Sequence, residues 1–129
     1  MRRKITLKTG VWLLILAAVL IALAACAPVQ ELPATGANRV EVQEEEFTLN
    51  MPTSIPAGQT VFEVTNVGTE EHSFVVEGQG IQAELEHHLQ PGETMSLEVD
   101  LPQGTYLVYC PVEDHAEEGM RLDLTVTAP

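Results

Sequence analysis

Apolar and polar residues alternate at a period of two through most of the chain after Arg39. This pattern predicts β-strands that each have one buried face, whereas the spacing of an amphipathic helix is rare in the same region. Turn-forming segments separate the alternating runs, among them IPAGQ, NVGTEE, EGQG, LQPGE and LPQGT. We therefore predict an all-β fold, an antiparallel two-sheet sandwich of about seven to eight short strands.

The same alternation predicts which side chains face the core, because successive side chains of a strand point to opposite faces. Histidine 72 then shares a face with Phe74 and Val76, and Cys110 shares one with Tyr106 and Val108. The other side chains expected to point inward are Val40, Val42, Phe47, Leu49, Phe62, Val64, Leu97, Val99, Leu101, Leu122, Leu124 and Val126.

The N-terminal segment reads as an export signal. Basic residues in MRRKITLKTG precede the uncharged run VWLLILAAVLIALAAC, which is short for a membrane-spanning helix. The end of this run, LAAC, resembles the lipobox of bacterial lipoproteins, in which the cysteine is lipidated after cleavage. We expect a signal peptide over residues 1–25, lipid on Cys26, a tether over 26–38 and one domain over 39–129. A plain secretion signal and an uncleaved anchor are the alternatives.

Charge limits the choice of partner. The chain has 19 acidic and 6 basic residues, and cleavage before Cys26 would leave only Arg39 and Arg121 as basic residues. Nucleic acid is excluded as a partner, because binding a polyanion relies on lysine and arginine. A cationic partner fits this charge, although negative charge is also common simply because it keeps exported proteins soluble.

Cysteine 110 would be the only thiol of the mature domain, so no disulfide is available to it. Histidine 115 and Met120 follow it at equal steps of five residues. With 4 His and 4 Met in 129 residues, a given cysteine has this spacing by chance about once in a thousand. Two imidazoles, a thiolate and a distant thioether suit copper, and His72 could supply the second imidazole if the two strand ends meet.

Each of these residues also has an ordinary structural interpretation. Histidine 72 could be a surface or hydrogen-bonded residue, Met120 a core residue, and Cys110 a buried thiol that acts as a small hydrophobe. The pair His87 and His88 lies before a turn, and we expect both side chains to be exposed to solvent.

Two segments together resemble the cupredoxins, the small blue-copper proteins. The segment NVGTEEHSF has the Asn-x-Gly turn and following histidine of that family, and LQPGETMSLEVDLPQGTYLVYCPVEDHAEEGM has its Pro-Gly-Glu turn, Gly-Thr-Tyr and C-x4-H-x4-M pattern. The resemblance covers residues 39–128 and is strongest to the auracyanins and other plastocyanin-like bacterial proteins. It implies a Greek-key sandwich with one type 1 copper ion, with His72, Cys110 and His115 as equatorial ligands and Met120 as the axial ligand.

Two features depart from the family pattern. Serine 73 follows the first histidine where relatives often have asparagine, and could hydrogen-bond across to the other ligand segment. Four acids, Glu113, Asp114, Glu117 and Glu118, flank His115 where relatives commonly have glycine, proline and apolar residues. We expect this charge to attract a basic partner and to favour Cu(II).

The resemblance implies a one-electron carrier rather than an enzyme. The chain has no paired His-x-His motif and no second cysteine in the ligand loop, as copper oxidases and dinuclear copper centres would require. We expect a monomer, anchored by lipid at the outer face of a bacterial membrane or in the periplasm, with His115 as electron port and a basic cytochrome or oxidase as partner. The alternative function is a copper-binding or copper-delivery lipoprotein.

Overall fold

The computed structural model describes residues 36–129. The signal peptide, the lipidation of Cys26 and most of the tether are predictions that lie outside the described residues. Within residues 36–129, no helix has the length and apolar character needed to cross a membrane.

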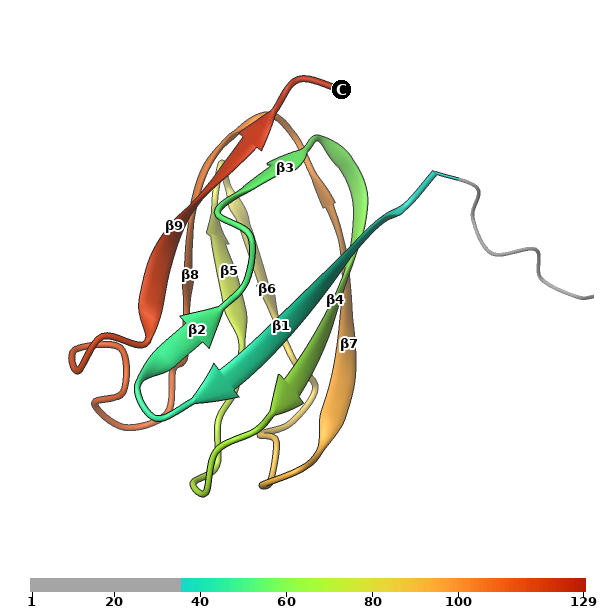
Figure 1. Ribbon diagram of the computed structural model, residues 1–129. Helices are drawn as coiled ribbons and strands as arrows, with labels where there is room; N and C mark the ends of the chain where they lie inside the picture. Colours follow the sequence, from blue (N-terminus) through green and yellow to red (C-terminus); the bar gives the residue numbers. More distant parts are fainter. Residues whose placement is uncertain (1–35) are drawn as a thin grey trace, which may run out of the picture. The chain divides into compact units, whose positions relative to one another are not determined.

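The described residues form two β-sheets that pack face to face (Figure 1). One sheet has the strand order β2-β1-β4-β7 and the other the order β3-β9-β8-β5-β6. The strands are β1 (Asn38–Glu45), β2 (Thr48–Asn50), β3 (Ser54–Pro56), β4 (Gly58–Asn66), β5 (Val75–Gly78), β6 (Ile81–Glu84), β7 (Thr94–Leu101), β8 (Gly104–Tyr109) and β9 (Arg121–Thr127).

The predicted two-sheet sandwich is confirmed, but its sheets are mixed and have nine strands in all. Strand β1 pairs with β4 in parallel, and β3 pairs with β9 in parallel. Alternation could not reveal this, because it determines which face a side chain takes and not which strand lies alongside. The two strands without a counterpart among the predicted alternating runs, β3 and β6, have only three and four residues and carry little pattern of their own.

The core lies between the sheets and follows the predicted parity. Phe62 and Phe74 contact each other across it, with ring centroids 5.3 Å apart. Most of the residues expected to face inward are buried, whereas Phe47, Leu49, Val99 and Leu122 are only partly so. Burial of these side chains is the main source of stability for a domain of this size.

Three connections meet at one end of the sandwich: the β1–β2 turn, the β4–β5 loop and the β8–β9 loop (Figure 1). They come from both sheets and are far apart in the sequence. The four predicted metal ligands all belong to the β4–β5 and β8–β9 loops. The fold therefore brings the two ligand segments to the same end of the domain.

Candidate metal centre

The β4–β5 loop is organised by Asn66, whose side chain is buried. Its carboxamide oxygen accepts a hydrogen bond from the backbone N–H of Gly68 at 2.9 Å, and its NH2 group donates to the carbonyl oxygens of Glu70 at 2.7 Å and Leu89 at 3.0 Å. This is the Asx-type turn that the Asn-x-Gly sequence favours. It leads directly to His72, whose backbone exchanges hydrogen bonds of 3.1 and 2.7 Å with Leu89.

The β8–β9 loop is held by backbone hydrogen bonds between the predicted ligand residues themselves. The N–H of Cys110 donates to the carbonyl oxygen of Met120 at 3.0 Å, and the N–H of Met120 donates to that of His115 at 2.9 Å. The N–H of His115 in turn donates to Val112 at 3.1 Å. These bonds fix the backbone positions from which the side chains of Cys110, His115 and Met120 project.

Three potential donor atoms, from His72, Cys110 and His115, lie within 4.8 Å of one another. The two histidine Nδ1 atoms are 3.3 Å apart, and Nδ1 of His115 is 3.7 Å from Sγ of Cys110. All three residues are buried, with exposed fractions of 0 to 3%. Methionine 120 is fully buried and belongs to the same apolar cluster as Cys110. The structure thus brings all four predicted ligand residues together.

The environment of these residues suits a metal ion. Burial, together with the nearby His115, lowers the pKa of His72, so the imidazole is neutral and can act as a ligand. Burial raises the pKa of the Cys110 thiol, so the thiolate needs a cation beside it. Two imidazoles, a thiolate and a nearby thioether fit a single type 1 copper ion better than a metal that prefers oxygen ligands.

Aromatic and backbone contacts complete the walls of the centre. The ring of Phe47, from the β1–β2 turn, lies edge-on to the ring of His115 with centroids 5.2 Å apart. The N–H of Ser73 donates to Sγ of Cys110 at 3.4 Å. The side-chain hydrogen bond that Ser73 could make to the other ligand segment is not formed, because its buried hydroxyl has no hydrogen-bond partner among the described residues. The backbone of Ser73, rather than its side chain, joins the two ligand segments.

Sequence analysis missed two carboxyl groups near the centre, Glu44 and Glu46. Both belong to the run EEE, which resembles a solvated segment. Glu44 is fully buried, and neither of its carboxyl oxygens has a partner among residues 36–129. The alternation of buried and exposed residues could have indicated this burial, because Glu44 lies on the same inward face of the strand as Val40 and Val42.

Glu46 occupies the β1–β2 turn and contacts the first ligand segment. Its Oε1 atom accepts hydrogen bonds from the backbone N–H groups of Thr69 and Glu70 and lies 3.7 Å from Nε2 of His72. No sequence pattern indicates this contact, which depends on where the turn lies relative to the β4–β5 loop.

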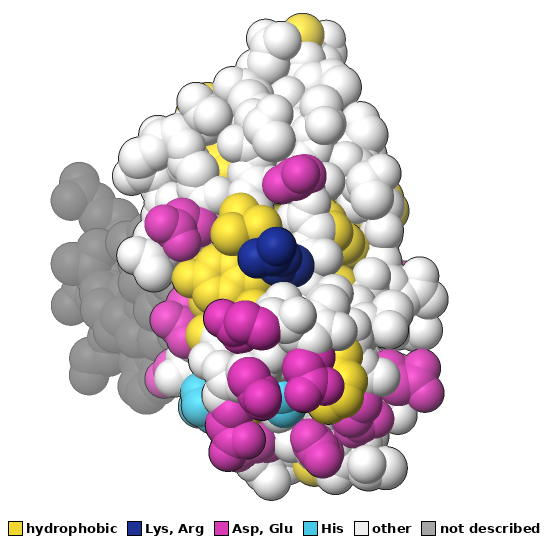
Figure 2. Space-filling view, turned by 90° about the vertical axis from the view of Figure 1, so that its left-hand side faces the viewer, with side chains coloured by type: hydrophobic (Ala, Val, Ile, Leu, Met, Phe, Trp, Pro, Cys, Tyr) yellow, Lys and Arg dark blue, Asp and Glu magenta, His cyan; other side chains and the backbone are white. Residues whose placement is uncertain are grey.

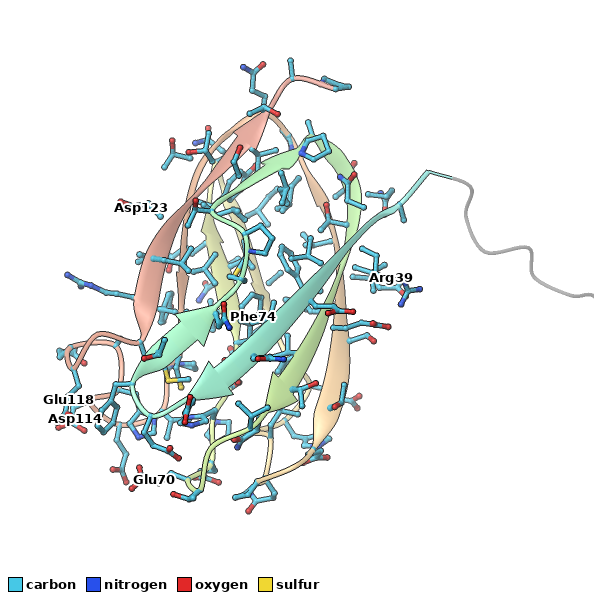
Figure 3. The ribbon with its side chains drawn as sticks, in the orientation of Figure 1. Arg39, Glu70, Phe74, Asp114, Glu118 and Asp123 are labelled. Atoms are coloured by element: carbon cyan, nitrogen blue, oxygen red, sulfur yellow. The ribbon has the colours of Figure 1, made fainter. Side chains whose placement is uncertain are left out.

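Acidic side chains surround the outer side of the centre. Glu70, Glu71, Glu113 and Val112 line a shallow depression that has His115 in its wall, and Oε2 of Glu70 lies 3.4 Å from Nε2 of His115. Figure 2 shows acidic side chains gathered around histidine at this end of the domain, and Figure 3 shows Glu70, Asp114 and Glu118 there. Only 3% of His115 is exposed, so its ring is recessed rather than protruding.

The remaining histidines lie outside the centre. The side chains of His87 and His88 are 57% and 47% exposed, which confirms the prediction that both face solvent. Their nearest carboxylates are those of Glu93 at 3.0 Å and Glu71 at 3.6 Å.

Comparison with solved structures supports the fold. An auracyanin from the photosynthetic bacterium Roseiflexus castenholzii is 20% identical, with a TM-score of 0.62 over 73% of this chain and 100% of that one. Auracyanin A from Chloroflexus aurantiacus is 19% identical, with a TM-score of 0.59 over 71% of this chain and 100% of that one. A blue copper oxidase from Nitrosomonas europaea is 17% identical, with a TM-score of 0.57 over 72% of this chain and 39% of that one.

Comparison with curated proteins gave no match. The model of the cupredoxin-like domain family, in contrast, matches residues 13–122, which is most of the chain. That match includes both ligand segments and ends at the start of β9. By its sequence, its sandwich fold and its buried cluster of two histidines and a cysteine, the chain belongs to the cupredoxin-like domain family.

Proposed function

We propose that this protein is a one-electron carrier that holds a single copper ion between His72, Cys110, His115 and Met120. The observation that carries the proposal is the buried cluster of His72, Cys110 and His115, whose donor atoms lie within 4.8 Å of one another. When bound, copper would supply the one-electron couple between Cu(I) and Cu(II).

The chain's contribution is to hold the donors still. Each ligand backbone is tied to a neighbour by hydrogen bonds of 2.7 to 3.1 Å, and the side chains are enclosed by the core and by Phe47. Donors that cannot move offer nearly the same geometry to both oxidation states, which keeps the reorganisation that accompanies electron transfer small. Burial also keeps water away from the donors.

A visible spectrum tests the proposal. Adding Cu(II) to the copper-free protein is expected to produce an intense visible band, because a copper–thiolate bond has a strong charge-transfer transition. Ascorbate should bleach the band and reoxidation should restore it over repeated cycles. A copper-delivery protein would instead bind one oxidation state without reversible cycling, and that result would reject the carrier proposal.

We further propose that the protein works outside the cytoplasm while attached to a membrane through lipid on Cys26. Support comes from the basic, apolar and LAAC segments at the start of the chain. Mass spectrometry of the protein from bacterial membranes would detect the lipid on Cys26. Recovery of an unmodified Cys26 in the membrane fraction would contradict this assignment.

The acidic side chains around His115 support a basic redox partner, such as a cytochrome or an oxidase. Exposed charges attract an opposite charge over a screening distance of about 10 Å at 0.1 M salt. We expect the reduced protein to react with a cationic cobalt(III) complex at a rate that falls by roughly tenfold or more between low and high salt. Stopped-flow measurement of the appearance of the visible band would give this rate, and ferricyanide, an anion, should show the opposite salt dependence.

Charge-neutralised variants locate the attractive surface. Replacing Glu113, Glu117 and Glu118 by glutamine should reduce the salt dependence of the cobalt reaction. A matched control replaces the same number of exposed acids on the other sheet, as Glu41→Gln, Glu98→Gln and Asp100→Asn. If the salt dependence fell equally in the two variants, the net charge of the protein, rather than the surface beside His115, would determine the rate.

A further inference from the structure

Nε2 of His72, the ring nitrogen that points away from the metal centre, is buried without a hydrogen bond to any described residue. Nδ1 of His72 faces Nδ1 of His115 at 3.3 Å, so Nδ1 is the atom offered to a metal. A neutral imidazole that binds metal through Nδ1 carries its proton on Nε2. Yet Nε2 of His72 is buried and has no hydrogen-bond partner among the described residues. Its nearest carboxylate in an ion-pair contact is that of Glu46, at 3.7 Å.

The Glu46 carboxylate is fixed at this position. Its Oε1 atom accepts hydrogen bonds from the N–H groups of Thr69 and Glu70, the latter at 2.8 Å, and from the Thr69 hydroxyl at 3.3 Å. Gly68 lies against the same carboxylate, and a Cβ atom there would collide with it. A glutamate carboxyl group that accepts two backbone N–H hydrogen bonds is ionised at neutral pH, so Glu46 places a negative charge beside His72.

We propose that Glu46 is a positioning residue for the copper centre, which orients the His72 ring through Nε2–H and favours the Cu(II) state. Metal-binding histidines commonly donate their second ring N–H to a carboxylate, which fixes the ring and makes it a better donor. The distance exceeds that of a normal hydrogen bond by about 0.7 Å, but the negative charge still acts on the ring. The inference rests on the proposed copper site.

A simpler interpretation is that Glu46 only joins the β1–β2 turn to the β4–β5 loop. The variant Glu46→Gln separates the two interpretations. The side-chain oxygen of glutamine can still accept the hydrogen bonds from Thr69 and Glu70, but the side chain carries no charge. Glu45→Gln is the matched control: it removes the same charge from the adjacent residue, whose side chain is exposed.

Redox titration of the copper-loaded variants is the decisive experiment. We expect Glu46→Gln to increase the ratio of Cu(I) to Cu(II) at a fixed applied potential by about tenfold, which is about 59 mV for one electron. Affinity for Cu(II) should fall by about tenfold as well. Glu45→Gln should change both quantities much less. Equal shifts in the two variants would overturn the role of Glu46 while leaving the copper site intact, whereas a wild type without the visible band would overturn both proposals.

A measurement on the wild-type protein serves if Glu46→Gln does not fold. In the Cu(I) form, proton NMR with nitrogen-15 labelling should detect Hε2 of His72, with solvent exchange much slower than for the ring protons of His87 and His88. Its chemical shift should be that of an N–H facing a carboxylate. An Hε2 signal at the position of a free imidazole N–H would overturn the proposal.

Discussion

Replacing Cys110 by serine is expected to abolish the visible band of the copper-loaded protein completely. The serine hydroxyl cannot provide the thiolate that a type 1 site requires. Mutation of a residue that hydrogen-bonds to a metal ligand typically lowers metal affinity about 10- to 100-fold. Loss of a ligand itself should therefore lower the affinity for Cu(II) at least about a hundredfold. Absorbance during Cu(II) titration measures both effects.

Met120→Leu is the matched control for this variant. Met120 is buried in the same cluster as Cys110, and leucine has a similar volume, so packing should be kept. We expect Met120→Leu to keep an intense band while Cys110→Ser loses it. Circular dichroism should show the same strand content in both. A band that survives in Cys110→Ser would mean that copper binds elsewhere, and the proposed site would be wrong.

Sequence parity predicted the centre because the ligands extend the pattern of buried strands. Cys110 follows β8 on the face of Tyr106 and Val108, and all three residues are buried. His72 lies before β5 and shares a face with Phe74, which is also buried. Parity therefore predicted that both side chains point inward, and the β-sandwich brings their loops to one end.

The surroundings of the centre depend on pairings that no local pattern encodes. Strand β1 pairs in parallel with β4, with Glu44 opposite Asn66, and this brings the β1–β2 turn against the β4–β5 loop. The contact between Glu46 and the loop follows from that pairing. Three consecutive glutamates look alike in the sequence, yet they differ in the structure: Glu44 is buried, Glu45 is exposed and Glu46 is partly covered.

Glu44 is expected to make the stability of the copper-free protein strongly dependent on pH. Its burial without a hydrogen-bond partner raises its pKa from an ordinary value of 4.5 to about 8. The folded state therefore keeps a proton that the unfolded state releases between those two pH values. The contribution of Glu44 to the free energy of unfolding should therefore be greatest below about pH 4.5 and should fall as the pH rises towards about 8.

The size of this effect follows from the difference in pKa. Each pKa unit corresponds to 1.36 kcal/mol, so Glu44 should lower the free energy of unfolding by about 5 kcal/mol in total between pH 4.5 and pH 8. Glu44→Gln resembles the protonated acid and cannot ionise, so it should remove this slope and make the protein more stable than wild type at pH 8. At pH 4.5 the two proteins should be nearly equal.

Urea unfolding of the copper-free protein between pH 4.5 and pH 9 measures the slope directly. Glu45→Gln is again the matched control, because it reports how much of the slope comes from repulsion among exposed acids. The slope should persist in Glu45→Gln and be absent in Glu44→Gln. Parallel curves for wild type and Glu44→Gln would mean that Glu44 is ionised in the folded state at neutral pH, in which case a counter-charge or solvent must reach it near Cys110.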